Sequence, residues 1–157
     1  MGKEIERKYL VKAGAWRPQG EGKKIRQGYL SSEKERIVRI RTKGHEAFLT
    51  IKGRTHGIVR SEFEYSIPME DAELMLAHLC EQPLIEKTRY IEEHEGHIWE
   101  IDVFLGANDG LVVAEVELQT ENEVFQLPVW AGKEVSADAR YFNSNLIQNP
   151  YSNWTEQ

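Results

Sequence analysis

The chain has 157 residues, 40% of them hydrophobic and 29% charged, with a formal net charge of −6. This length suits a single domain over residues 1–157, and the one cysteine, Cys80, excludes an intrachain disulfide and a cysteine-based zinc site. The negative charge disfavours general nucleic-acid binding, and no apolar run approaches the roughly 20 residues that span a bilayer, so we expect a cytoplasmic protein without membrane or nucleic-acid partners.

Alternation of apolar and polar residues, the pattern of half-buried strands, runs through most of the chain. Glycine-containing connections such as Lys43-Gly44-His45 and Glu95-Gly96-His97 favour antiparallel hairpins between these strands. Residues 12–24, which hold several glycines and a proline, are typical of a loop. The pattern predicts eight strands, near residues 3–11, 24–32, 36–43, 46–53, 58–67, 85–94, 97–105 and 111–120.

Two segments predict helices instead. After Pro68, residues 70–80 begin with acidic side chains and continue with apolar residues at helical spacing. The second predicted helix begins after Ser136, a candidate N-cap, and runs to Pro150 with apolar residues at helical intervals.

Charged residues follow the predicted strands at two-residue intervals. Glu4, Glu6 and Lys8 share one face of the first strand, about 7 Å apart. Pairs of like charge recur downstream at Arg39/Arg41, Glu62/Glu64, Lys87/Arg89, Glu100/Asp102 and Glu115/Glu117. The opposite faces are apolar, so the charged faces are either the solvated outside of an ordinary barrel or sandwich, or the lining of a lumen.

The separation of signs argues against a purely solvated face. Like charges on neighbouring positions repel, and a face selected for solubility would mix signs. Carboxylates gathered in excess of their basic partners require bound cations or raised pKa values. Oxygen ligands favour Mg²⁺ or Mn²⁺ over zinc, and the basic strands favour a small polyanionic substrate. This combination predicts phosphoryl transfer.

These residues resemble the CYTH superfamily, the triphosphate tunnel metalloenzymes, over nearly the whole chain. The opening mark is the family's E-x-E-x-K motif, present as Glu4-x-Glu6-x-Lys8. A segment resembling the family's closing helix follows at residues 140–146. The marks between them, in family order, are Gln27-Gly28-Tyr29-Leu30, Val38-Arg39-Ile40-Arg41, Leu49-Thr50-Ile51-Lys52, Glu62-Phe63-Glu64-Tyr65, Lys87-Thr88-Arg89-Tyr90, Glu100-Ile101-Asp102 and Ala114-Glu115-Val116-Glu117-Leu118.

The resemblance implies a mainly β, α+β fold: an eight-stranded antiparallel β-barrel forming a charged tunnel, with a few helices packed outside. The apolar strand faces then become the barrel exterior. Two helices are too few to cover that exterior, so we expect a homodimer.

The resemblance also implies roles for individual residues. Two divalent ions, Mg²⁺ or Mn²⁺, are expected on Glu4, Glu6, Asp102, Glu115 and Glu117. Substrate phosphates are expected on Lys8, Tyr29, Arg39, Arg41, Lys52, Arg54, Lys87 and Arg89. The catalytic residues are expected among Lys8, Glu62, Glu64 and Glu117, with the group that orients the attacking water left open.

For four residues, an ordinary structural role is an alternative to a role in the site. Tyr29 either contacts substrate or packs in the core, and Arg54 either extends the basic lining or is an exposed hairpin arginine. Tyr141 and Asn143 either close a tunnel mouth or belong to ordinary helix packing.

The activity predicted first is metal-dependent hydrolysis of a triphosphate, above all inorganic tripolyphosphate, to phosphate and pyrophosphate. Within the same fold, the alternatives are hydrolysis of nucleoside or thiamine triphosphates and cyclisation of ATP by a class IV adenylate cyclase. A non-catalytic polyphosphate-binding module is an alternative of another class, and the excess of carboxylates argues against it.

Overall fold

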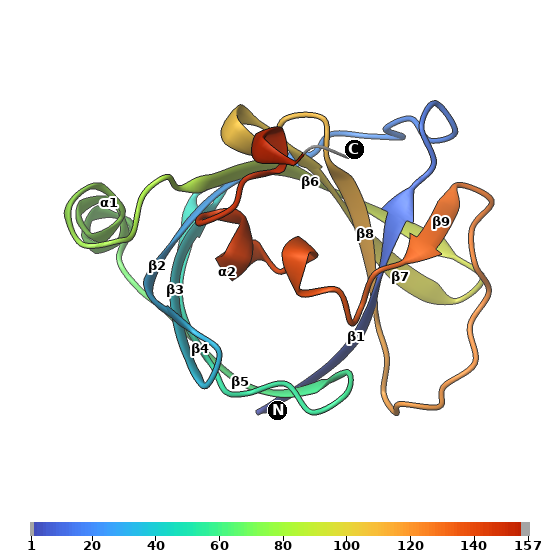
Figure 1. The fold of residues 1–157 in the computed structure, drawn as a ribbon, viewed down its shortest axis with the longest axis horizontal. Coiled ribbons are helices and arrows are strands. Elements are labelled where there is room, and N and C mark those ends of the chain that lie inside the picture. Colours follow the sequence, from blue (N-terminus) through green and yellow to red (C-terminus); the bar gives the residue numbers. More distant parts are fainter. Residues whose placement is uncertain (1, 155–157) are drawn as a thin grey trace.

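The computed structural model describes residues 2–154, and its architecture is a closed antiparallel barrel with helices at its outside and at one end (Figure 1). The strands are β1 Lys3–Val11, β2 Lys23–Glu33, β3 Arg36–Lys43, β4 Glu46–Lys52, β5 Val59–Ser66, β6 Ile85–His94, β7 His97–Phe104, β8 Val112–Glu117 and β9 Ala131–Glu134. The α-helices are α1 Met69–His78 and α2 Asn143–Leu146. Short 3₁₀ turns occupy Gly106–Asn108, Ala139–Tyr141 and Tyr151–Asn153.

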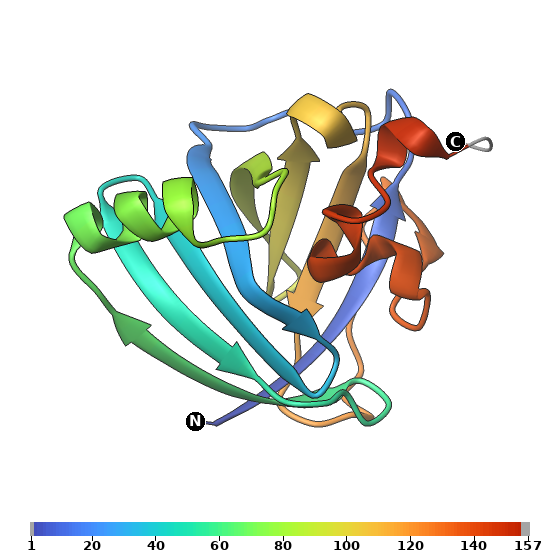
Figure 2. The same cartoon turned by 60° about the vertical axis from the view of Figure 1, so that its left-hand side comes forward.

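All strand pairings are antiparallel, and the order is β5-β4-β3-β2-β6-β7-β8-β1-β9. The barrel closes where Lys3 to Ile5 of β1 pair with Val59 to Ser61 of β5. Figure 2 shows β1 crossing the barrel obliquely, which lets its later residues pair with β8 and β9. The predicted eight-stranded barrel is confirmed, and β9 is an additional strand that the alternation pattern missed.

The apolar strand faces form two clusters outside the barrel. Helix α1 lies across β3 and β4, where its Ala72 and Leu76 pack against Ile40. On the opposite side, Trp99 and its neighbours on β1, β7 and β8 are covered by the segment containing Trp130. Within residues 2–154, no helix is long and apolar enough to cross a bilayer.

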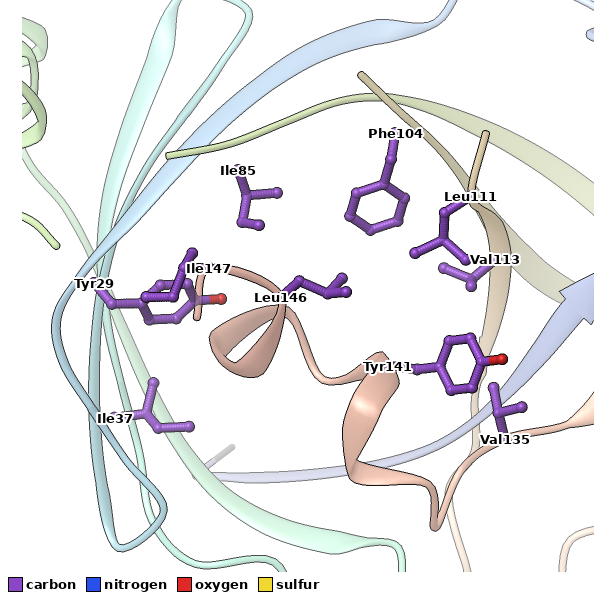
Figure 3. Packing of buried hydrophobic residues seen from close by; sticks show 10 residues of the cluster. All are labelled: Tyr29, Ile37, Ile85, Phe104, Leu111, Val113, Val135, Tyr141, Leu146 and Ile147. Carbon is purple, nitrogen blue, oxygen red and sulfur yellow. The ribbon is translucent and has the colours of Figure 1, made fainter. Parts of the chain in front are cut away.

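A third apolar cluster fills one end of the barrel interior (Figure 3). Leu146 and Ile147 pack there against inward-facing residues such as Ile37, Ile85 and Val113. Only part of the lumen is therefore charged, because the C-terminal segment fills this end.

The continuous helix predicted from Ser136 to Pro150 is wrong. Asp138 accepts a hydrogen bond from the backbone N–H of Arg140, starting a 3₁₀ turn, and Phe142 is extended before the single turn α2. Asn143, Ser144 and Asn145 compete for backbone hydrogen bonds, so local preference for a long helix is weak here. Packing into the barrel end decides the conformation instead.

Candidate active site in the barrel lumen

Inward-facing charged side chains line a cavity of about 300 Å³ inside the barrel, named the chamber below. The alternation of strand residues explains the lining, because every second side chain of β1, β3, β5, β6 and β8 points inward. Register places acidic and basic positions side by side, as Lys8 lies opposite Glu115 and Glu6 opposite Glu117. The charged lining residues are Glu4, Glu6, Lys8, Arg39, Arg41, Lys43, Lys52, Arg60, Glu62, Glu64, Lys87, Arg89, Glu100, Glu115 and Glu117.

The basic wall is organised by a buried carboxylate, Asp102. Its side chain is 1% exposed, and Arg89 donates to both of its oxygens, from Nε at 2.8 Å and from Nη2 at 2.9 Å. The Lys87 ammonium lies 2.8 Å from Asp102 Oδ2. Asp102 is absent from the chamber lining, so these contacts place it behind the wall, between two cations, rather than at the metal position expected from the sequence.

Burial disfavours the charged forms of two side chains in the basic wall. Burial lowers the pKa of Lys87 to about 7. Arg89 and Arg41 also lower this pKa, and the negative charge of Asp102 offsets only part of the decrease. Burial, together with Arg39 and Arg89, also lowers the pKa of Arg41 to about 9. A bound polyanion would favour the charged form of both side chains.

Three carboxylates of the opposite wall are already paired with cations. Lys52 Nζ lies 3.0 Å from Glu4 Oε1 and 3.6 Å from Glu62 Oε2. Glu64 Oε2 lies 3.6 Å from Arg39 Nη2, and the Thr50 hydroxyl, which donates to Glu64 at 3.0 Å, accepts from Arg39 at 3.2 Å. These contacts hold Glu4, Glu62 and Glu64 at fixed places on the wall.

Glu6, Glu115 and Glu117 form the acidic centre, and none of them makes a salt bridge with the described residues. Burial and the neighbouring Glu115 raise the pKa of Glu6 well above its usual value. Burial alone would also raise the pKa of Glu115, but Lys8 and the hydrogen bond with Glu6 hold it well below the usual range. Glu6 is therefore the carboxyl of this pair that takes up a proton more readily.

The chemistry of this centre fits a divalent cation. Burial and nearby carboxylates, Glu4 first, also raise the pKa of Glu117 and of Glu62, so the charged forms of these carboxylates are disfavoured in the absence of a cation. Carboxylate oxygens are the ligands that Mg²⁺ and Mn²⁺ prefer. Within residues 2–154, no group of three or more His, Cys, Asp or Glu side chains is arranged to coordinate a metal ion. The carboxylates would therefore have to move closer together when the ion binds.

The raised pKa of Glu6 predicts a pH-dependent response to Mg²⁺. A cation competes with the proton on Glu6, whose pKa is raised, so Mg²⁺ binding strengthens as the pH rises above the usual glutamate range. We expect Mg²⁺ to increase the melting temperature more at about pH 8 than at about pH 5. Differential scanning fluorimetry with and without Mg²⁺ measures this, and Glu6→Gln should flatten the pH dependence. An equal Mg²⁺ effect at both pH values would contradict competition between Mg²⁺ and a proton on Glu6.

The C-terminal segment closes part of the chamber. Lys8 Nζ donates to the Tyr141 carbonyl at 3.1 Å, and Lys87 Nζ donates to Asn143 Oδ1 at 2.9 Å. Phe142 lies between them at the chamber wall, with the Lys8 ammonium and the Arg60 guanidinium each 6.0 Å from its ring centroid. Of the two interpretations of this segment, the structure supports closure by Asn143, whereas the Tyr141 ring packs in the apolar end.

The chamber brings together most of the residues singled out from the sequence. Tyr29 lines it, and its hydroxyl accepts a hydrogen bond from Gln27 at 2.9 Å. Arg54 lies outside, 64% exposed, with Nη1 3.6 Å from Glu35 Oε1, so the exposed-hairpin interpretation holds.

Sequence reasoning missed several lining residues. Lys43 and Arg60 continue the inward faces of β3 and β5, two positions beyond Arg41 and two before Glu62. The two-residue alternation alone would have found both. Phe142 and Ser144 had no such signal, because their position depends on the fold of the C-terminal segment.

The closed antiparallel barrel encloses a chamber lined by eight cations and seven carboxylates. These features define a class of protein that can hold a small polyanion. The CYTH domain family model matches residues 2–151. The chain belongs to the CYTH domain family, and this membership implies dependence on a divalent metal ion.

Named relatives agree over almost the full length. The chain is 50% identical over 156 residues to an inorganic triphosphatase of Acetivibrio thermocellus, covering 99% of this chain and 100% of the relative. It is 40% identical over 149 residues to an inorganic triphosphatase of Nitrosomonas europaea, covering 91% and 95% of the two chains. A crystal structure described as an inorganic triphosphatase superposes with a TM-score of 0.66 at 36% identity, covering 92% of this chain and 93% of the other.

Proposed function

We propose that this protein is a metal-dependent triphosphatase that hydrolyses inorganic tripolyphosphate to phosphate and pyrophosphate. The observation that carries the proposal is one chamber in which the basic wall of Arg39, Arg41, Lys87 and Arg89 faces the acidic centre of Glu6, Glu115 and Glu117. Two relatives described as inorganic triphosphatases, at 50% and 40% identity, support the same substrate.

The basic side chains hold the substrate in this proposal. Lys8, Arg39, Arg41, Lys52, Lys87 and Arg89 grip phosphate oxygens, and the planar arginine forks fix the orientation of the chain of phosphates. Asp102 acts indirectly, because its two oxygens hold Lys87 and Arg89 in place. Orientation of the triphosphate by fixed cations lowers the entropic cost of reaching the transition state.

The acidic centre holds the metal. Glu6, Glu115 and Glu117, with Glu4 beside them, would bind Mg²⁺ or Mn²⁺, and room for two ions is part of the proposal. A divalent ion supplies charge neutralisation and a more acidic bound water when present. In this proposal Glu62, Glu64 or Glu117, which all line the chamber, orients a water for in-line attack on a terminal phosphorus, and the P–O bond that breaks leaves pyrophosphate.

Phosphate release tests the function. We expect the purified protein to release phosphate from tripolyphosphate faster than from ATP or thiamine triphosphate, with Mg²⁺ or Mn²⁺ and not with chelator. Glu4→Gln and Glu117→Gln should each lower the rate by roughly 10²-fold or more, because each removes a proposed metal ligand. Formation of cAMP from ATP at a higher rate, or tight binding without turnover across several metals, would contradict the proposal.

We also propose that the protein forms a homodimer through the outer face of β4 and β5. Helix α1 leaves this part of the barrel uncovered, and the apolar side chains Ile51, Phe63 and Tyr65 are 40%, 49% and 56% exposed. Ile51 and Phe63 are direct partners across the two strands, so they form one patch. A second copy would remove this patch from water.

Light scattering at micromolar concentration tests the dimer. We expect a dimeric mass for the unchanged protein and a monomeric mass for Phe63→Ser, because a polar side chain at the centre of the patch weakens apolar contact. Ile91→Ser, at a residue 58% exposed on β6 and away from the patch, serves as the matched control. A monomeric mass for the unchanged protein would contradict the dimer.

A further inference from the structure

Gln27 is a polar side chain that is completely buried in the barrel wall. It lies in β2, directly opposite Arg41 of β3 on one side and Ile85 of β6 on the other. Its side chain does not line the chamber, so it is not placed to contact a substrate. A buried amide needs hydrogen-bond partners, and the identity of those partners indicates what the residue does.

Each end of the Gln27 amide contacts a different part of the site. The Oε1 oxygen accepts a hydrogen bond from Arg41 Nε at 2.8 Å. The Nε2 nitrogen donates to the Tyr29 hydroxyl at 2.9 Å and to Asn143 Oδ1 at 3.4 Å. Asn143 Oδ1 also accepts from Lys87 Nζ at 2.9 Å, so Gln27 connects Arg41 with the closing segment and with a second cation of the basic wall.

Arg41 has a neutral hydrogen-bond partner, whereas Arg39 and Arg89 of the same wall pair with carboxylates. Arg39 lies 3.6 Å from the Glu64 carboxylate, and Arg89 pairs with Asp102 at 2.8 Å. Arg41 makes no salt bridge with any residue in the described part of the chain, and its side-chain hydrogen-bond partner there is the neutral Gln27. Its positive charge is therefore the least compensated of the three.

We propose that Gln27 is a positioning residue that fixes the Arg41 guanidinium through a neutral acceptor and so leaves its charge available for a substrate phosphate. Glutamate at this position would fit the same space but would pair with Arg41 and compensate its charge. An apolar residue of similar length would leave Arg41 Nε buried without an acceptor. The inference rests on the proposed function, because it takes a phosphate chain as the ligand of Arg41.

Steady-state kinetics with tripolyphosphate and Mg²⁺ test this role. We expect Gln27→Glu to raise KM by roughly 10- to 100-fold, the range of one charge-assisted hydrogen bond, with a smaller change in kcat. Gln27→Met should raise KM less, because the charge of Arg41 stays available and only its orientation is lost. Gln148→Glu adds the same negative charge at an exposed site bonded to Ser32, and its KM should equal that of the unchanged protein.

A double-mutant cycle separates positioning from a general structural role. If Gln27 acts through Arg41, then Gln27→Glu should raise KM no further in an Arg41→Ala background. Equal increases in both backgrounds would overturn the inference, as would an unchanged KM for Gln27→Glu alone. Where Gln27→Glu does not fold by circular dichroism, the same comparison is made with Gln27→Met.

Direct binding distinguishes failure of the inference from failure of the proposed function. Calorimetric titration of the unchanged protein and Gln27→Glu with tripolyphosphate in chelator needs no turnover. Weaker binding by Gln27→Glu supports the role of Gln27 even if the unchanged protein hydrolyses nothing, an outcome that would refute only the triphosphatase. Equal affinities, or no binding by the unchanged protein, would overturn the positioning role.

Discussion

Replacing Glu115 by glutamine is expected to lower kcat/KM for tripolyphosphate by roughly 10³-fold. Glu115 lies at the meeting point of the two walls, 9% exposed, opposite Lys8 on β1 and Glu100 on β7. Its pKa, which burial alone would raise, is held well below the usual range by Lys8, Glu6 and the basic wall, so it is ionised at neutral pH. The substitution removes this charge from the proposed metal centre.

The rates should be measured over a range of Mg²⁺ concentrations. Loss of a metal ligand predicts that higher Mg²⁺ recovers part of the rate in Glu115→Gln, whereas loss of folding predicts no recovery. Glu86→Gln makes the same exchange on an exposed strand position outside the chamber and should keep the rate of the unchanged protein. A rate for Glu115→Gln within about threefold of the unchanged protein would remove Glu115 from the metal centre.

Replacing Asp102 by asparagine is expected to lower the free energy of unfolding by about 3–5 kcal/mol, because it leaves Lys87 without its anion and Arg89 with the more exposed Glu100 alone, at 3.3 Å. Lys87 and Asp102 are each 1% exposed at the side chain, and Arg89 is 7% exposed. Asparagine keeps the shape but cannot neutralise either cation. Urea denaturation followed by tryptophan fluorescence measures the change.

The pH dependence of this loss has a defined sign. Burial would raise the pKa of Asp102, but Lys87 and Arg89 lower it below the usual range, so its stabilising effect is present at neutral pH and disappears on acidification. The difference between Asp102→Asn and the unchanged protein should therefore shrink below about pH 4. Asp138→Asn, in an exposed pair with Arg140, should change stability by less than about 1 kcal/mol. An equal decrease in the free energy of unfolding in the two variants would contradict the idea that the buried ion pairs of Asp102 stabilise the fold more than an exposed pair does.

The strands and the two walls could be predicted because they depend on local alternation. Glu62 and Glu64, or Lys87 and Arg89, lie on the same side of a strand wherever the strand is placed, since successive side chains point to opposite faces. Whether that side faces water or a lumen does not follow from alternation. The family resemblance supplied this choice, and the structure agrees with it.

Positions that depend on contacts between distant segments could not be predicted in this way. Asp102 shares the inward face of Glu100 on β7, yet Lys87 and Arg89 of β6 surround it and take it out of the chamber lining. Arg54 follows the Lys52 face by count, but β4 has ended by then and the side chain extends to Glu35.

The path of the C-terminal segment also could not be predicted from local sequence. Its apolar spacing was compatible with a helix outside the barrel, and local hydrogen-bond competition by Asn143 to Asn145 gave no strong preference. Packing of Leu146 and Ile147 into the barrel end decided its path, and that path placed Asn143 against Lys87.

The sequence by itself determined which side chains share a strand face, where the first helix lies, and that pairs of like charge occupy single strands, because these properties repeat over two to four residues. The tertiary structure alone decided which charges compensate one another. Asp102 pairs with two cations, Glu115 beside Glu6 helps to raise the pKa of Glu6, and Arg41 keeps a neutral partner in Gln27. Burial makes such pairings strong, and burial is set by strands that are far apart in the sequence and adjacent in the barrel.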